Sequence, residues 1–210
     1  MSKSKIGVSF VSLALAAVFC FCVAFPVSAQ ESTPAPKPRP GDELPAFVLK
    51  DYNGKEYALN NLEGKVVVLD FSSQECPYSR GVDPHLAELA KSYEGKDVVF
   101  LSIDSHFKTT VEEIKKYAEE NKLPFPILKD EGNVYADMVG ATRTPEFYVL
   151  NKELVLVYHG PFDDRKEPDK KGETEYLRNA IDKTLAGKPV EPSEVKVWGC
   201  TIKRAEKKAQ

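Results

Sequence analysis

The sequence predicts an α/β fold in which a central mixed β-sheet is flanked by helices. Two apolar, β-branched runs have the composition of buried strands. Segments with helical periodicity alternate with them, and such alternation favours parallel strand pairing. Two further strand patterns late in the chain are joined only by a short turn, which adds an antiparallel edge. The strand patterns are 66–71, 98–103, 147–150 and 154–158, and the helical patterns are 77–93, 110–121 and 173–186.

An N-terminal β-hairpin is predicted ahead of the first long strand. The apolar segments 46–49 and 56–59 flank a turn that contains Asn53 and Gly54. Asn-Gly between two apolar runs is a strong hairpin signal, because both residues readily adopt the positive φ angles of a tight turn. The hairpin is therefore expected as an extension of the α/β core.

The first long strand leads into a cysteine at the expected start of a helix. A short polar stretch follows residues 66–71, and then come Cys76 and Pro77. Proline suits the first helical position, where its missing N–H costs no hydrogen bond. A thiol there lies at the positive end of the helix dipole, which lowers its pKa and favours the nucleophilic thiolate. Cys76 is therefore the leading candidate for a reactive residue.

The later helices carry boundary signals. Thr110 and Glu113 have the spacing of a capping box at the start of the second helix. Gly187 and Pro189 are expected to end the last helix. Pro84 lies inside the first helix and is expected to kink it or to mark a broken start.

The first 29 residues have the layout of a secretory signal peptide. Lys3 and Lys5 precede an apolar run, and small residues lie ahead of a cleavage point before Gln30. The apolar run over 6–25 is long for a signal peptide, so an uncleaved membrane anchor is the alternative. We therefore expect an exported protein, periplasmic or otherwise extracytoplasmic, that contacts a membrane only if this segment stays uncleaved.

The rest of the chain is predicted to form a linker, one domain and a tail. Residues 30–41 are rich in proline and lack apolar periodicity, so an extended, semi-rigid linker is expected. The domain covers 42–187 and the tail covers 188–210. The net charge of −3, with no basic stripe, argues against nucleic-acid binding. The three histidines lack metal-ligand spacing, so no metal is expected.

Three features resemble the thioredoxin-like superfamily. Cys76 follows a strand and precedes a helix, Asp70 lies six residues before it, and Thr144-Pro145 precedes a later strand. The resemblance is closest to the redoxin branch, also called AhpC/TSA-like. The phrases ECPY around Cys76, RTPE around Pro145 and GCTIK around Cys200 look like those of redoxin-domain proteins.

This resemblance implies a thioredoxin-like sandwich over roughly 42–187, with an N-terminal hairpin extension. It implies that Asp70 is buried and helps to move protons during thiol exchange. It also implies that Pro145 is a cis proline packed opposite the reactive sulfur, with neighbouring backbone that can pair with an incoming peptide strand.

The chain departs from the thioredoxin pattern at Ser79, where a vicinal partner cysteine would stand. A serine can hydrogen-bond the thiolate but cannot resolve a mixed disulfide. After signal removal Cys76 and Cys200 are the only thiols, and export would place them where disulfides persist. The hypothesis is that the tail folds back and Cys200 resolves the adduct, with Gly199 allowing close approach. A permanent structural disulfide, or pairing of Cys200 with a second chain, stays open.

The predicted function is thiol–disulfide exchange with protein or small-molecule thiols and disulfides and with a redox partner protein. No bound cofactor is required, because the electrons come from another thiol. Cys76 would attack as a thiolate stabilised by the helix N-terminus and Ser79. The predicted catalytic residues are Cys76, Cys200, Asp70 and Ser79, and the predicted substrate-binding residues are Pro77, Tyr78, Arg143, Thr144 and Pro145.

A thiol-dependent peroxidase is the main alternative. Peroxiredoxins carry a proline and a hydroxyl residue at fixed places before the cysteine, together with an arginine that binds the peroxide. Ser73 fills the hydroxyl position and Arg143 could supply the charge, but Leu69 stands at the proline position. The match to the peroxidase pattern is therefore partial.

Two further functions are considered. A redox-inactive thioredoxin-like binding module could hold an extended peptide in a groove beside Tyr78 and Pro145. A copper chaperone would need a second cysteine four residues after Cys76, where Arg80 stands. The copper function is therefore the weakest alternative.

Overall fold

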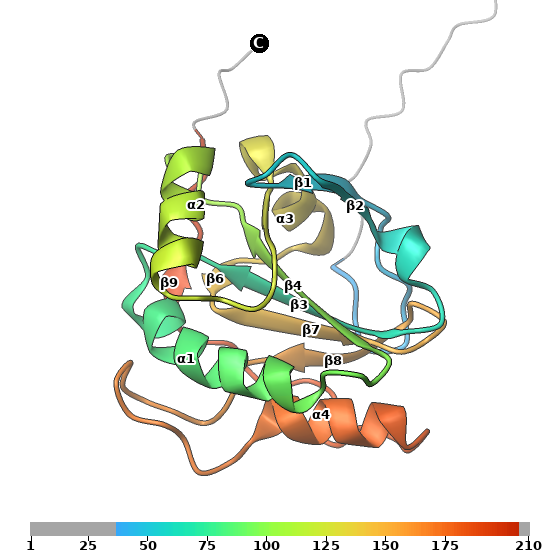
Figure 1. Cartoon of the computed structure of the whole chain (residues 1–210). Coiled ribbons are helices and arrows are strands. Elements are labelled where there is room, and N and C mark those ends of the chain that lie inside the picture. Colours follow the sequence, from blue (N-terminus) through green and yellow to red (C-terminus); the bar gives the residue numbers. More distant parts are fainter. Residues whose placement is uncertain (1–36, 206–210) are drawn as a thin grey trace, which may run out of the picture. The chain divides into compact units, whose positions relative to one another are not determined.

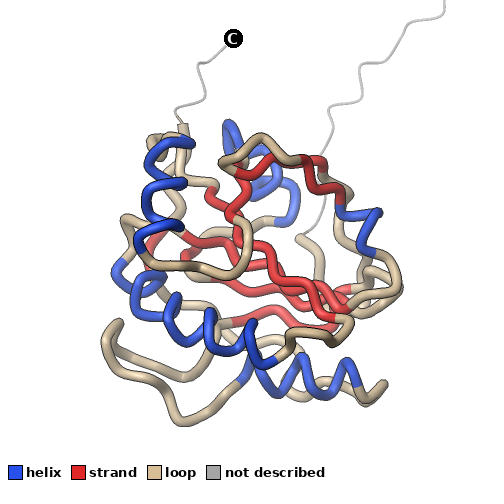
Figure 2. The backbone as a smooth tube through the Cα atoms, in the orientation of Figure 1, coloured by secondary structure: helices blue, strands red, loops and turns tan. Residues whose placement is uncertain are grey.

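The computed structural model describes residues 37–205, so the predicted signal peptide and most of the predicted linker lie outside the described residues. The described part forms the predicted α/β sandwich around a mixed seven-stranded sheet (Figures 1 and 2). The strand order in this sheet is β2-β1-β5-β4-β3-β7-β8, and β6 and β9 form a separate two-stranded sheet. The strands are β1 Val48–Asp51, β2 Glu56–Ala58, β3 Val66–Ser72, β4 Val98–Asp104, β5 Ile127–Lys129, β6 Arg143–Thr144, β7 Glu146–Leu150, β8 Leu156–Gly160 and β9 Cys200–Thr201. The helices are α1 Pro77–Ser92, α2 Val111–Glu120, α3 Val134–Val139 and α4 Tyr176–Leu185, with 3₁₀ turns η1 Leu59–Leu62 and η2 Glu131–Asn133.

Strand β3 lies near the middle of the sheet and is buried along its whole length. It pairs in parallel with β4 and antiparallel with β7. Its alternate side chains pack into two cores on opposite faces. Val66 and Val68 pack with residues of α1 and α4, whereas Val67 and Leu69 pack with residues of α3. Figure 1 shows the same layering, with α1 and α4 together on one side of the sheet.

The predicted hairpin, strand pair and capping box are all present. Strands β1 and β2 pair across the Asn53-Gly54 turn, and β7 pairs antiparallel with β8. The Thr110 side chain accepts from the N–H of Glu113, whose carboxylate accepts from the Thr110 N–H at 2.8 Å. Helix α1 continues across Pro84 as one helix.

The structure contains elements that the sequence pattern did not predict. Strand β5 inserts between β4 and β1, so it joins the N-terminal hairpin to the central sheet. Helix α3 supplies Tyr135 and Ala136 to one core. With three and six residues, these two elements are too short for hydrophobic periodicity to identify them.

Both ends of the described chain pack onto the domain. The Gly41 N–H donates to the Leu156 carbonyl at 2.8 Å, and β9 near the C-terminus pairs with β6. The last described residues of the predicted linker are therefore hydrogen-bonded to the domain. Across residues 37–205, no helix is long and apolar enough to span a membrane.

Candidate active site

Cys76 lies in the short connection between strand β3 and helix α1. It occupies the N-cap position, and Pro77 begins the helix. Only 2% of the Cys76 side chain and backbone surface is exposed. Its Sγ lies 3.0 Å from the carbonyl oxygen of Thr144, which precedes the cis peptide bond to Pro145. The thiol is thus held between a helix N-terminus and the cis-proline loop.

The tail brings Cys200 to the same place. Strand β9 pairs antiparallel with β6, and Cys200 lies directly opposite Thr144 in the register. Gly199 makes this approach possible, since its φ is +137° and a Cβ there would lie 2.3 Å from the Thr144 oxygen. The two cysteines are both free thiols in this structure.

The two thiols affect each other's ionisation in opposite directions. Burial raises the pKa of Cys76, but hydrogen bonds from the Cys200 thiol and the Ser79 N–H outweigh burial, so the net pKa is lowered. Burial and then the hydrogen bond and charge of Cys76 raise the pKa of Cys200 to about 11. Cys76 is therefore the thiol that ionises first, with Cys200 as its donor.

Ser79 lies fully buried in the first turn of α1. Its hydroxyl oxygen accepts from the N–H of Ser73 at 3.3 Å, which fixes the polar stretch ahead of Cys76. Its own N–H donates to Cys76. The serine thus contributes to the thiolate environment through its backbone and orders the preceding turn through its side chain.

Asp70 lies on β3 and is 2% exposed, in agreement with the expected buried position. Neither of its carboxylate oxygens has a hydrogen-bond partner among the described residues. Burial, followed by the charges of Asp83 and Cys76, raises the pKa of Asp70 well above its usual value. Burial of this kind favours the neutral form of the carboxyl, which can hold or release a proton.

Asp83 on α1 is a second buried carboxyl near Asp70. Its Oδ2 accepts from the Tyr117 hydroxyl at 2.5 Å. Burial raises the pKa of Asp83 to about 6, although the Tyr117 hydrogen bond acts in the opposite direction. The sequence pattern does not identify Asp83, since a carboxyl on a helix gives no sign of which face is buried.

Tyr78 and Arg143, both predicted to bind substrate, contact the tail in this structure. The Tyr78 ring meets the Trp198 ring edge-on at 5.2 Å between centroids. Arg143 Nη1 donates to the Thr201 hydroxyl at 2.9 Å and lies 3.4 Å from the Gly199 carbonyl. The tail therefore covers the side of the site that these residues line.

Glu146 is a further buried charge that the sequence analysis did not single out. It begins β7 directly after Pro145 and is fully buried. Its Oε2 accepts from the N–H groups of Thr142 and Arg143, both at 2.8 Å. An acidic residue at the start of a strand pattern was the available signal, but its partners come from several parts of the chain.

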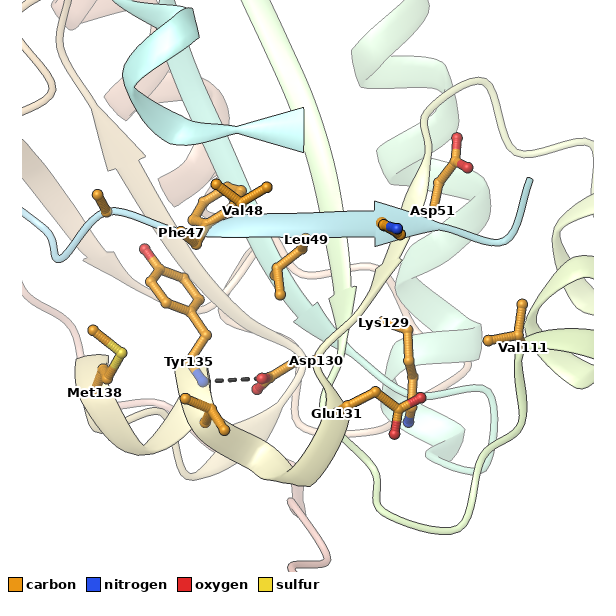
Figure 3. A pocket seen from close by; sticks show the side chains of 13 residues that line it. Phe47, Val48, Leu49, Asp51, Val111, Lys129, Asp130, Glu131, Tyr135 and Met138 are labelled. Atoms are coloured by element: carbon orange, nitrogen blue, oxygen red, sulfur yellow. Dashed lines mark hydrogen bonds between the residues drawn. The ribbon is translucent and has the colours of Figure 1, made fainter. Parts of the chain in front are cut away.

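A mostly apolar pocket lies away from Cys76. It has a volume of about 590 Å³ and lies between β1 and the region of η2 and α3 (Figure 3). Phe47, Val48, Tyr135 and Met138 are among its mostly apolar lining. Within residues 37–205, no group of three or more His, Cys, Asp or Glu side chains could hold a metal ion. The groups gathered at the site that could carry chemistry are the two thiols and the buried carboxyls.

Comparisons with known sequences relate this chain to thiol enzymes. The AhpC/TSA family profile matches residues 40–159. A chloroplastic peroxiredoxin Q from Sedum lineare is 36% identical over 144 residues, which cover 61% of this chain and 73% of that protein. The thiol-disulfide oxidoreductase ResA from Halalkalibacterium halodurans is 29% identical over 124 residues, or 58% of this chain and 69% of that protein. The predicted class of enzyme, a thiol oxidoreductase or antioxidant, is confirmed by these relatives.

Comparisons with solved structures agree on the fold. A hypothetical protein from Sinorhizobium meliloti 1021 has a TM-score of 0.75 and 31% identity, covering 80% of this chain and 96% of its own. A putative thioredoxin from Neisseria meningitidis has a TM-score of 0.57 and 23% identity, covering 68% of this chain and 89% of its own. The predicted thioredoxin-like fold is confirmed.

Proposed function

The chain belongs to the AhpC/TSA family, and on that premise we propose that it is a thiol–disulfide oxidoreductase whose exchange runs between Cys76 and Cys200. The observation that carries this proposal is the register of β6 and β9, which sets Cys200 opposite Thr144 while Thr144 contacts Cys76. The opposed pKa shifts of the two thiols support the same division of roles.

The exchange consists of two displacements. The Cys76 thiolate attacks one sulfur of a substrate disulfide, which forms a mixed disulfide and releases one substrate thiolate. Cys200 then gives up its proton and attacks the Cys76 sulfur, which releases the second substrate thiolate and closes the Cys76–Cys200 disulfide. Two electrons pass from the protein to the substrate, and a partner dithiol (or two partner thiols) returns them by becoming a disulfide.

Asp70 is proposed to assist the proton steps. The charge of Cys76 is one of the causes that raise the pKa of Asp70, so the carboxyl lies within electrostatic reach of the thiol. Ser79 stabilises the Cys76 thiolate through its N–H. Thr144 and Pro145 are proposed to position the sulfur that approaches Cys76, since the Thr144 carbonyl already lies 3.0 Å from Sγ.

A thiol count across glutathione buffers tests this proposal. Full-length protein is equilibrated at a series of glutathione ratios, and the linked peptides are identified by mass spectrometry. We expect a reversible Cys76–Cys200 bridge with a measurable midpoint, which also gives the direction of electron flow. A Cys76→Ser variant should form no internal bridge, and a wild-type protein that never forms the bridge would contradict the proposal.

A peroxidase is the second candidate, favoured by the 36% identity to a peroxiredoxin Q. In that reaction the Cys76 thiolate takes one oxygen from a hydroperoxide, giving a sulfenic acid and an alcohol or water. Cys200 then condenses with the sulfenic acid, releasing water and forming the same disulfide. Oxidation of Cys76 by hydrogen peroxide no faster than that of free cysteine would exclude this candidate.

The site of action is proposed to lie outside the cytoplasm. The pattern of Lys3, Lys5 and the apolar run over 6–25 supports an export signal. N-terminal sequencing of the mature protein from a secreting host tests this: a start at Gln30 is expected, and an intact Met1 in a membrane fraction would favour the anchor instead.

A further inference from the structure

The tail covers the reactive thiol by occupying the strand edge beside it. Residues 198–204, here called the clasp, contain β9, which pairs with Arg143 and Thr144 of β6. The pairing continues past β9, because the Ile202 N–H donates to the Thr142 carbonyl at 3.0 Å. Within the described chain, β6 has no other strand partner.

No room remains between the clasp and the cis-proline loop. A Cβ on Gly199 would lie 2.3 Å from the Thr144 oxygen and 3.5 Å from Pro145 Cδ. Contacts under 3.0 Å are essentially absent for real Cβ atoms, so even one methyl group does not fit there without movement. Cys76, beneath this contact, is 2% exposed. A polypeptide can therefore reach its sulfur only if the clasp moves.

The clasp is anchored on both sides of Cys200. On one side, Trp198 packs against Tyr78 at the start of α1. On the other side, Ile202 is 3% exposed and belongs to the core that contains α3. Lys203 then donates to Glu75 at 3.0 Å.

Hydrogen bonds also hold the C-terminal end of the clasp. Arg204 Nε donates to Asp137 at 2.6 Å, and its Nη2 donates to the Ala141 carbonyl at the same distance. The clasp is thus held against the domain by strand pairing and side-chain contacts.

We propose that the clasp selects the substrates of Cys76, admitting low-molecular-weight disulfides and excluding cysteines held in an extended polypeptide strand. An extended strand gains affinity by pairing with an exposed strand edge, and the clasp already fills the edge of β6. A small disulfide needs only a brief local opening of the clasp at Cys200 to reach the Cys76 sulfur, whereas a strand needs the whole β6 edge to be free. This inference rests on the proposed exchange function and names its substrate class.

The test compares two variants that both lack the resolving thiol. One is Cys200→Ser, and the other combines Gly199→Ala with Cys200→Ser, which forces a Cβ against the Thr144 oxygen. The rate at which Cys76 forms a mixed disulfide is measured with 2-hydroxyethyl disulfide and with an extended peptide that carries an activated disulfide. We expect displacement of the clasp to raise the rate of mixed-disulfide formation with the peptide at least about tenfold. The reason is that the docked clasp exposes the β6 edge only when it opens transiently. The rate with the small disulfide should change less than about threefold.

A matched glycine controls for backbone strain. Gly187 also has a positive φ, of +64°, but a Cβ there meets nothing within 4 Å. Gly187→Ala combined with Cys200→Ser should therefore leave the ratio of the two rates unchanged. If Gly199→Ala prevents folding, Lys203→Glu replaces it, because this exposed residue would then repel Glu75 without disturbing the core.

The outcomes separate this inference from the proposed function. A peptide-to-small-disulfide rate ratio that stays constant when the clasp is displaced would overturn the inference, as would an equal rise of both rates. None of these variants contains Cys200, so the result does not depend on whether Cys200 resolves the mixed disulfide. Failure of the proposed function would appear instead as absence of the Cys76–Cys200 bridge in the wild-type protein.

Discussion

Two buried carboxylic acids on neighbouring strands have pKa values that are shifted in opposite directions. Asp70 lies on β3 and Glu146 lies on β7, and the register sets them against Phe147 and Phe71 respectively. Successive residues of a strand point to opposite faces, so Asp70 faces the α1 core and Glu146 faces the α3 core. Both are almost completely buried, yet the pKa of Asp70 is raised well above its usual value and the pKa of Glu146 is lowered to about 2.

Hydrogen-bond donors explain the charge on Glu146. Burial alone would raise its pKa, but hydrogen bonds from His159 and from two backbone N–H groups lower it to about 2. Its five donors come from five separate residues. They are Lys37 at 3.4 Å, Thr142, Arg143, Tyr148 and His159, the last four at 2.8 Å.

Asp70 has no such set of donors among the described residues: the Ser102 hydroxyl bonds the Asp70 backbone oxygen at 3.4 Å, and its effect on the carboxyl lowers the pKa by less than burial and the charges of Asp83 and Cys76 raise it. A buried charge persists only where donors converge on it. The comparison teaches that the donor set, and not burial, separates a carboxylate that holds a loop in place from a carboxyl that can carry a proton.

Replacement of Glu146 should have the largest effect. We expect Glu146→Ala to lower the free energy of unfolding by about 3–5 kcal/mol, since it leaves His159 and two backbone N–H groups without their acceptor. The folded-state pKa lies below the ordinary 4.5, so this stabilisation is present above about pH 4.5 and is lost as the pH falls towards about 2. Urea unfolding at pH 7 and pH 3 measures both effects.

Glu194 provides the matched control for Glu146. It lies 3.6 Å from the other ring nitrogen of His159, but its side chain is 56% exposed. Glu194→Ala should therefore cost less than about 1 kcal/mol. A Glu146→Ala penalty that is equal at pH 3 and pH 7 would contradict the ionised state assigned to Glu146.

Replacement of Asp70 should affect chemistry more than stability. Asp70→Asn keeps the shape of a neutral carboxyl, so we expect no loss of stability at pH 7 and a gain relative to wild type. The reason is that the raised folded-state pKa costs the wild-type protein stability as the pH rises above the usual value of 3.8. The rate of disulfide exchange should fall about a hundredfold if the carboxyl transfers protons.

The measurement is the pH profile of exchange for both proteins, with urea unfolding alongside. The variant should lose the part of the profile that follows the raised Asp70 pKa. Destabilisation of several kcal/mol without any change in exchange rate would show that Asp70 is a structural residue.

In its hydrogen bonding, Asp83 is intermediate between Asp70 and Glu146, because the Tyr117 hydroxyl donates to it. Tyr117→Phe removes that donor, so we expect the pKa of Asp83 to rise above about 6 and stability at pH 8 to fall by about 1 kcal/mol. Since a raised folded-state pKa costs stability as the pH rises from 3.8 through 6, the penalty should be smaller at pH 4. Carboxyl titration by NMR and urea unfolding at both pH values check this, and an unchanged Asp83 pKa would refute it.

Much of the fold could be predicted from local patterns. The hairpin, strands β3 and β4, the β7–β8 pair and helices α1, α2 and α4 each carry their own periodicity or turn signal. Strand β5 and helix α3 could not be predicted, because the few residues of β5 acquire a defined place only by pairing with β4 and β1, and those of α3 only by packing into the core around Phe47 and Phe71. The same limit hid Asp83 and Glu146, whose burial and partners depend on distant segments.

While the burial of Asp70 was implied only by the resemblance to thioredoxin-like proteins, the sequence by itself determined a cysteine at a helix N-terminus and a proline before a later strand. These features are local, since propensity, capping and strand alternation act over a few residues. Only the tertiary structure decided that the tail returns to pair with β6 and sets Cys200 beside Cys76. That outcome depends on the strand register, on the space that Gly199 leaves and on anchors from Tyr78 to Asp137, none of which adjacent residues encode.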